Sequence, residues 1–216
     1  MIRTCLLGLV VQIVLNGSVE GPSTQAARNQ PPLMDRQKEI ALALSACPAH
    51  LASKASVYVL DRSGYVKIRE GQNGFTAIVQ HSLPTSQEPQ CMDAEGTRTL
   101  LPRILKVAEL RAEDKSPEEI TRFVADGFAR GLFQPPTRPG VDYMLSTENL
   151  VPDEKGAVEH FPPHVMFYAP YLTNADLGSD GNNATAFVAG EGTPHALIIV
   201  PVGVHQQSIK EGGRHE

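Results

Sequence analysis

The sequence predicts an α+β fold, built as a single domain around one mainly antiparallel sheet of five to six strands. Predicted strands and helices come in blocks along the chain, whereas an α/β fold would alternate them. The chain has 216 residues, of which 41% are hydrophobic and 20% are charged. This composition allows one domain of ordinary size with a packed core.

The first block of the domain is a helix followed by three strands. Asp35 is placed to cap a helix that continues to about Cys47, because Ile40 and Leu44 have helical spacing and Pro48 follows. Three strand-like runs come next, separated by an Asp-Arg-Ser-Gly turn and by an Asn-Gly pair, which is a strong hairpin signal. We therefore expect a three-stranded antiparallel meander made of Ser56–Leu60, Tyr65–Arg69 and Phe75–Gln80.

The second block is a pair of helices. Thr99 is placed to cap the first helix, which ends at Asp114. The Ser-Pro-Glu-Glu run that starts at Ser116 is a capping box with Pro at the first helical position, and this second helix continues to Gly131. We expect a helical hairpin that packs, together with the N-terminal helix, on one side of the sheet.

The third block contains three more strands, at 141–146, 164–169 and 196–202. The last two are nearly continuous apolar runs, which is typical of central strands covered on both faces. Long polar stretches at 147–163 and 173–193 separate these strands. Loops of that length in a compact domain often carry function.

Residues 1–26 are typical of a secretory signal peptide. Arg3 precedes an apolar run, Cys5–Leu15, and small-x-small cleavage patterns end at Gly21 and at Ala26, of which we prefer the second. The run of 11 residues is shorter than the roughly 20 that cross a bilayer. We therefore expect a cleaved leader, with an uncleaved anchor as the alternative.

After the leader we expect a flexible lead-in at 27–34, the single domain at 35–203 and a disordered tail at 204–216. The predicted location is secreted or periplasmic. In such an oxidising compartment the two cysteines that remain after cleavage, Cys47 and Cys91, are expected to form a disulfide. Two separate thiols are the alternative.

Composition limits the partners. The formal net charge is −5 and no cluster of Lys and Arg is present, so binding to nucleic acid or to anionic lipid is not expected. The chain has no Trp and 6% aromatic residues, which disfavours a base-stacking surface. No stable membrane insertion is expected after cleavage. The expected partner is a small molecule or a protein of the cell envelope.

Two histidines suggest a metal site. His164 and His195 each follow a Pro and each open an apolar strand. If these strands were parallel neighbours, both imidazoles would meet at one end of the sheet, where Asp93 or Glu191 would complete a three-ligand zinc site. Zinc would then polarise a water for hydrolysis. The alternative is that both histidines bond backbone carbonyls, since no short zinc-binding motif is present.

Other side chains suggest a ligand site. Tyr168 and Tyr171 end the second predicted strand of the third block, where they would line the mouth of a pocket together with His164 and His195. Ordinary packing at the edge of the sheet is the alternative. Asp93 and Glu95 point the same way in an extended chain and would bind a cation or act as acid and base. The alternative is a solvated loop before a helix.

No serine-nucleophile elbow and no phosphate-binding loop is present in the sequence. We therefore expect an exported soluble domain that binds a small molecule or a protein and is not an enzyme. The alternative function is a metal-dependent hydrolase that uses the strand-end histidines and a carboxylate. An accessory role in envelope assembly is a third hypothesis.

Overall fold

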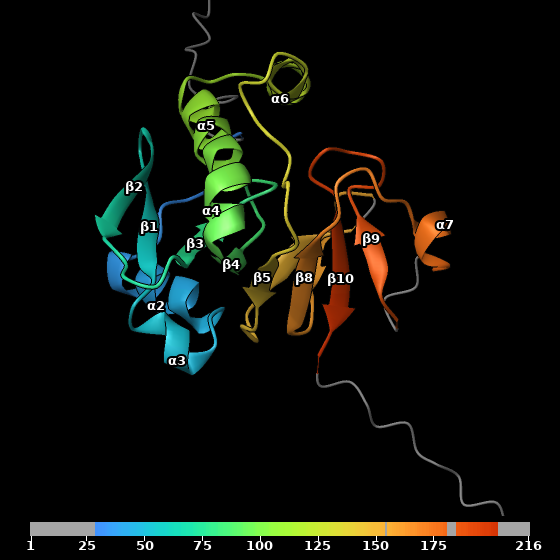
Figure 1. The fold of residues 1–216 in the computed structure, drawn as a ribbon. Coiled ribbons are helices and arrows are strands. Elements are labelled where there is room, and N and C mark those ends of the chain that lie inside the picture. The colour runs from blue at the N-terminus through green and yellow to red at the C-terminus, as the bar shows by residue number, and fades with distance from the viewer. Residues whose placement is uncertain (1–28, 154, 181–184, 203–216) are drawn as a thin grey trace, which may run out of the picture.

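The computed structural model describes residues 29–153, 155–180 and 185–202. It contains a mixed eight-stranded sheet of order β2-β1-β3-β4-β5-β8-β10-β9, and a separate hairpin of β6 and β7 (Figure 1). The α+β class is confirmed, but the sheet is larger than the five to six strands predicted. The predicted signal peptide at 1–26 and tail at 204–216 lie outside the described residues.

The strands are β1 (Ser56–Asp61), β2 (Gly64–Arg69), β3 (Thr76–Gln80), β4 (Glu88–Met92), β5 (Val141–Met144), β6 (Leu150–Pro152), β7 (Val158–His160), β8 (His164–Tyr168), β9 (Phe187–Ala189) and β10 (Leu197–Pro201).

The predicted meander is wrong in its third strand. The β1–β2 hairpin forms as expected, but β3 lies on the other side of β1 and runs parallel to it. The connection between β2 and β3 passes tightly under β1, since a Cβ at Gly71 would lie 2.3 Å from Ser56 N. Asn73 Nδ2 donates a hydrogen bond to Leu51 O at 2.9 Å. The Asn-Gly pair therefore anchors a crossover instead of turning a hairpin.

Four strands were not predicted from the sequence. β4 is a central strand whose five residues are all buried, yet it contains Pro89, which has no N–H for the strand ladder and weakens the sequence signal. β6, β7 and β9 have three residues each, which is too short for a recognisable alternation of polar and apolar side chains.

Helices α2 (Arg36–Ser45) and α3 (Ala49–Ala52) lie on one face of the sheet. Asp35 caps α2, as predicted, by accepting hydrogen bonds from the backbone of its first turn. The disulfide between Cys47 and Cys91 is confirmed and ties the end of α2 to β4. Its Cα atoms are 5.1 Å apart, inside the usual range.

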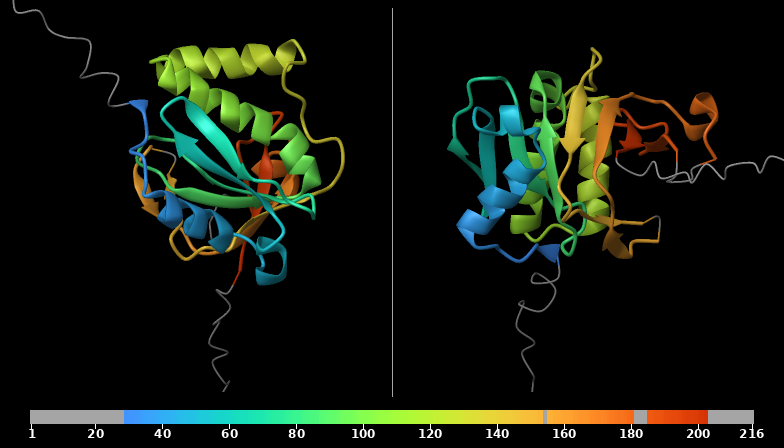
Figure 2. Two further views of the ribbon diagram at one scale, coloured as in Figure 1. Left: turned by 90° about the vertical axis from the view of Figure 1, so that its left-hand side faces the viewer. Right: turned by 90° about the horizontal axis from the view of Figure 1, so that it is seen from below.

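The other face carries α4 (Ala94–Thr99) and α5 (Leu101–Ala112), and α6 (Pro117–Ala129) stacks on α5 away from the sheet (Figure 2). The helical hairpin and the capping box at Ser116 are confirmed. Thr99 does not cap a helix: it lies in α4 and donates to Glu95 O, while Asp93 caps α4. Helices thus cover both faces, and the expectation that they share one side is wrong.

Helix α5 covers only one half of the sheet face on which it lies. In that half, Leu101 and Ile104 pack near Ile78 of β3. No described helix lies over β8 and β10, so these strands are not covered on both faces as predicted; Phe167 is 45% exposed on the α2 side. A short helix, α7 (Asn174–Leu177), follows β8 beyond the edge strand β9. None of the described helices is long and apolar enough to cross a bilayer.

Candidate functional site

A cavity of about 1050 Å³ lies on the α5 face of the sheet, over the strands that α5 leaves uncovered. We call it the sheet cavity. Inward side chains of β4, β5, β8 and β10 form its floor, and the start of α5, the β6–β7 hairpin and β9 form its walls. Its size is near the upper end of small-molecule sites. The apolar part of the lining includes Met144, Val151, Phe161, Met166, Phe187, Leu197 and Ile199.

Asp142 is a fully buried carboxyl in the floor of the sheet cavity. Its Oδ1 accepts a hydrogen bond from Cys91 N at 3.1 Å, while its Oδ2 has no hydrogen-bond partner among the described residues. Burial raises the pKa of Asp142 well above its ordinary value, and the negative charge of Asp93 adds to this. The protonated carboxyl is favoured, and Oδ2 can then donate as well as accept a hydrogen bond.

Glu88 is a second buried carboxyl in the lining, but its oxygens already have partners. Oε1 accepts from Ser82 N at 2.9 Å and lies 2.6 Å from Ser86 Oγ, and Oε2 lies 2.6 Å from Ser82 Oγ. Burial raises the pKa of Glu88, and the hydrogen bonds of the two serines oppose that shift. Glu88 therefore belongs to the structure of the cavity floor and is not free to hold a ligand.

Arg103 of α5 and His195, which precedes β10, carry two more unpartnered groups. Arg103 Nε and His195 Nδ1 are buried and have no hydrogen-bond partner in the described part of the chain. The His195 ring stacks on Phe128, with centroids 5.5 Å apart. Burial and the positive charge of Arg103 lower the pKa of His195 to about 4, so its imidazole is neutral at pH 7. Burial also lowers the pKa of Arg103, to about 10, which leaves the guanidinium charged.

Unpartnered buried polar atoms are therefore concentrated at this site. Four such side-chain atoms occur among the described residues, and three of them belong to residues that line the sheet cavity. Buried polar atoms in native proteins nearly always have a partner, and each exception calls for an explanation.

His164 also lines the sheet cavity, but it has a structural role that the sequence analysis gave as the alternative. It is buried at the start of β8, and its Nδ1 lies 2.8 Å from Pro162 O. The ring meets Phe161 edge to face, with centroids 4.8 Å apart. Burial lowers the pKa of His164, so this imidazole too is favoured in its neutral form.

The structure does not have the parallel strand arrangement on which the metal hypothesis depends. β8 and β10 are neighbours but antiparallel, and His164 pairs with Pro201, whereas His195 lies before the opposite end of β10. Glu191 reaches the exposed rim of the sheet cavity, and Asp93 is not part of its lining. In residues 29–153, 155–180 and 185–202, no three His, Cys, Asp or Glu side chains are grouped so that they could hold a metal ion.

The predicted tyrosines and Asp93 lie outside the sheet cavity. Asp93 accepts hydrogen bonds from Gly96 N at 2.9 Å and from Val141 N at 2.9 Å, so it joins α4 to β5. The hydroxyl of the buried Tyr168 lies 3.1 Å from Asp93 Oδ1. Tyr171 is 60% exposed in the turn after β8. These contacts join secondary-structure elements and do not open into the cavity.

Sequence reasoning missed Asp142, Glu88 and Arg103. Asp142 occupies an inward position of a predicted strand, and strict attention to the alternation in Val-Asp-Tyr-Met would have identified a buried acid there. Glu88 lies in β4, which was not predicted. Arg103 is four residues from Val107, so helical spacing places both on the same side of α5. An arginine on the apolar side of a helix was the signal that could have identified it.

Comparisons with known protein families, with curated proteins and with solved structures gave no match for this chain.

Proposed function

We propose that the protein is an exported, non-enzymatic binding domain that holds an uncharged small organic molecule in the sheet cavity. The observation that carries this proposal is the buried Oδ2 of Asp142, which faces no partner among the described residues. A buried polar atom left without a hydrogen bond costs about 1–3 kcal/mol. Oδ2 is not exposed to solvent in this structure, so a hydroxyl, amide or carbonyl group of a ligand would offset that cost once a small side-chain movement brought it within hydrogen-bond distance.

The charges of the lining support an uncharged ligand. The neutral forms of His164 and His195 are favoured, and the protonated form of Asp142 is favoured by burial. Glu88 and Arg103 attract each other electrostatically, so their opposite charges compensate. An ion that entered this cavity would lose its hydration without gaining an unopposed countercharge.

The apolar floor supports a ligand with an apolar body. Met144, Met166 and Ile199 form a small buried cluster below the cavity, and Phe161 and Phe187 pack against it. Methionine side chains adapt to irregular shapes, which suits a binding floor. The polar end of the ligand would then lie near Asp142 of β5, Arg103 of α5 and His195, which precedes β10.

The exported location is part of the proposal. It is supported by the leader pattern at 1–26 and by the disulfide, because disulfides persist mainly in oxidising compartments. Sequencing the N-terminus of the protein from its native host tests it. We expect Ala27 as the first residue, and a mature protein that retains Met1 would contradict export through a cleaved leader.

Methionine methyl groups report directly on the sheet cavity. With ¹³C-labelled methionine methyl groups, a set of uncharged alcohols, amides and phenols can be screened against the protein that starts at Ala27. We expect at least one compound to shift the Met144 and Met166 signals and to leave the Met34 signal unchanged, since Met34 packs in the core under α2. A set in which no compound moves these two signals contradicts the proposal.

Three variants locate the binding. Ala189→Phe fills the sheet cavity from β9, and Ala175→Phe places the same ring at an exposed position on α7 as the matched control. His195→Phe keeps the stack on Phe128 but removes Nδ1. We expect binding to be lost in Ala189→Phe, kept in Ala175→Phe and weakened about tenfold in His195→Phe. Binding that survives Ala189→Phe would exclude the sheet cavity as the site.

A further inference from the structure

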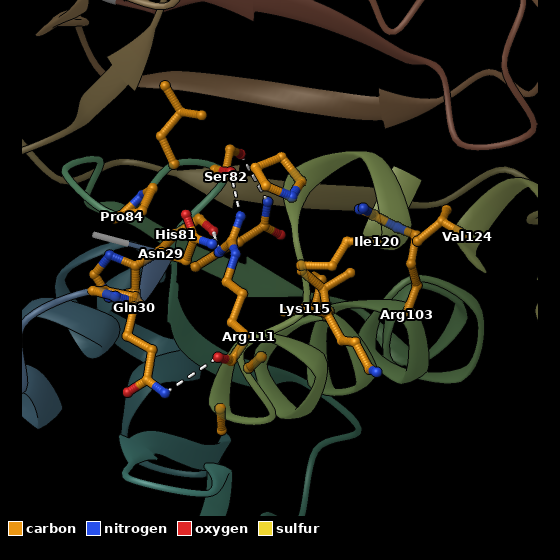
Figure 3. A pocket seen from close by; sticks show the side chains of 18 of the residues that line it. Asn29, Gln30, His81, Ser82, Pro84, Arg103, Arg111, Lys115, Ile120 and Val124 are labelled. Carbon is orange, nitrogen blue, oxygen red and sulfur yellow. Dashed lines mark hydrogen bonds between the residues drawn. The ribbon is translucent and has the colours of Figure 1, made fainter. Parts of the chain in front are cut away.

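A second cavity, of about 720 Å³, lies between α5, α6 and the segments at 29–33, 80–84 and 193–195 (Figure 3). We call it the helix cavity. Its volume is typical of a small-molecule site. Both helices turn an apolar stripe toward it. The apolar side chains of the two stripes are Ile104, Val107, Ala108, Ile120, Val124 and Phe128.

The charged residues in this lining are almost all basic, although the whole chain has a net charge of −5. The acidic exception is Asp61, whose carboxylate pairs with Arg36 at 3.5 Å. A basic, apolar cavity in an acidic protein is complementary to an organic anion. The basic residues are Arg62, Arg103, Arg111 and Lys115.

Arg111 is held in place inside the helix cavity. Its guanidinium donates hydrogen bonds to the carbonyl oxygens of His81 and Ser82, and Gln30 Nε2 donates to Arg111 O at 3.2 Å (Figure 3). The two hydrogen bonds from the guanidinium fix the orientation of the side chain without neutralising its charge. Arg111 forms no salt bridge with a carboxylate in the described part of the chain.

Arg103 lies two turns earlier on α5, and Glu88 is the carboxylate that attracts it. Arg103 also forms no salt bridge among the described residues, and its Nε is unpartnered. Glu88 attracts both arginines, but its oxygens are bonded to Ser82 and Ser86. One carboxylate against two partly buried guanidinium groups leaves a net positive charge, and an unpaired buried charge is unfavourable.

We propose that the helix cavity binds a single-chain amphipathic carboxylate. The apolar chain lies between the stripes of α5 and α6, and the carboxylate lies against Arg111. Lys115, whose Nζ is 4.0 Å from Glu119 Oε1 on the surface, adds a second, weaker contact. A guanidinium with free N–H groups forms strong, charge-assisted hydrogen bonds to a carboxylate. This cavity adjoins the sheet cavity, and the residues that line both are Gln80, Ser82, Arg103, Ile104 and His195.

Isothermal titration calorimetry with sodium dodecanoate, kept below its micelle concentration, tests the proposal. We expect binding of one dodecanoate per chain. Dodecanol, which has the same chain without the charge, is expected to bind about tenfold more weakly or worse. Butyrate, which has the charge without the chain, is expected to show no binding. Equal binding of dodecanol and dodecanoate would overturn the assignment of the charge.

Variants test which residues form the site. Arg111→Gln and Lys115→Gln each remove one cation, and we expect dodecanoate affinity to fall about tenfold in the first and severalfold in the second. Thr121→Trp fills the helix cavity from α6 while keeping every cation, and Ala129→Trp is the matched control on the same helix outside the lining. Circular dichroism checks that each variant folds.

Loss of binding in Thr121→Trp with retention in Ala129→Trp supports the proposal even if Arg111→Gln does not fold. Retention in Thr121→Trp overturns it. Ala189→Phe, which fills the sheet cavity, is expected to bind dodecanoate normally, so the two cavities are tested independently. Loss of dodecanoate binding in Ala189→Phe would place the carboxylate in the sheet cavity and overturn this assignment.

An anionic membrane could present the same chemistry. Cosedimentation with vesicles of neutral phosphatidylcholine, with and without anionic phosphatidylglycerol, separates the two sources. We expect no added binding to the anionic vesicles. Binding to them by a protein that does not bind free dodecanoate would overturn the proposal in favour of a membrane surface.

Discussion

Cys47, one residue beyond the C-cap of α2, is disulfide-bonded to the fully buried Cys91 in β4. The bond crosses a sequence separation of 44 residues and joins the helix to a central strand. Because a crosslink restricts the unfolded chain, the double variant Cys47→Ala/Cys91→Ala should lose about 4 kcal/mol of unfolding free energy in the chain-entropy model. Urea denaturation of both proteins measures the difference.

Thiol counting provides the control for the disulfide. The mature protein, denatured without reductant, should release no thiol from Cys47 or Cys91. After reduction it should release both and unfold at lower urea. Free thiols in the unreduced protein, or unchanged stability of the double variant, would contradict the role assigned to this bond.

Gly71 allows the chain to cross under β1, and we expect Gly71→Ala to be strongly destabilising. The added Cβ would lie 2.3 Å from Ser56 N and 2.8 Å from Lys54 O, which are backbone atoms that cannot rotate away. Overpacking of this kind costs about 1–3 kcal/mol or more. Gly131→Ala is the comparison, because φ is +75° there and no atom lies within 4 Å of the added Cβ.

In Gly131→Ala only the left-handed backbone is unfavourable, by about 1–2 kcal/mol. Urea denaturation of the two variants should therefore rank Gly71→Ala as the less stable. The reverse order would mean that the crossover relaxes more easily than its contacts suggest.

Local signals in the sequence were sufficient wherever the partners lie within a few residues. Asp35 caps α2 and Ser116 caps α6 through hydrogen bonds to the first turn of each helix. The residue type at each of these two positions is therefore enough to predict where the helix begins. The β1–β2 hairpin likewise depends on a short turn. The pairing of β3 with β1 could not be predicted from a local signal. The Asn-Gly pair is compatible both with a hairpin turn and with an anchored crossover.

Strand direction was the main obstacle to predicting the site. His164, His195 and Glu191, which the sequence analysis singled out, lie on loops and strand ends of the third block and line the sheet cavity. Their arrangement depends on whether β8 and β10 are parallel, which no local pattern determines. Asp142 belongs to the first strand of the third block and Arg103 to the second block, so only the folded structure brings them together with these residues.

Glu95 should make the protein less stable in acid. It is 3% exposed and accepts hydrogen bonds from Arg98 Nη2 at 2.6 Å, Thr137 N at 2.7 Å and Arg138 Nη2 at 3.3 Å. Burial alone would raise the pKa of Glu95, but the Arg98 guanidinium and the Thr137 N–H lower it to about 2. Because the pKa is lower in the folded state, this stabilisation is present above about pH 4.5 and is lost as the pH falls toward 2.

The variant Glu95→Gln should therefore be less stable than the wild type at pH 7, by about 1.5–3 kcal/mol. Urea denaturation between pH 7 and pH 2 should show the gap closing as the wild-type carboxylate becomes protonated. Glu113→Gln, at an exposed position, is the control and should keep a constant small difference. A gap that widens toward pH 2 would contradict the assigned direction of the shift.

Asp142 should have the opposite effect on stability. Burial raises its pKa above the ordinary value, so the folded state binds a proton more tightly than the unfolded state does. The folded state then loses stability as the pH rises from the unfolded pKa of about 4 toward the folded pKa.

The variant Asp142→Asn tests this direction. Asparagine cannot ionise, and its amide oxygen can still accept the hydrogen bond from Cys91 N. We expect Asp142→Asn to match the wild type near pH 3 and to be the more stable protein at pH 7, as measured by urea denaturation. Asp126→Asn, exposed on α6, should show no such pH dependence. A variant that is equally destabilised at both pH values would mean that the shape or the hydrogen bonds of Asp142, and not its charge, determine its contribution.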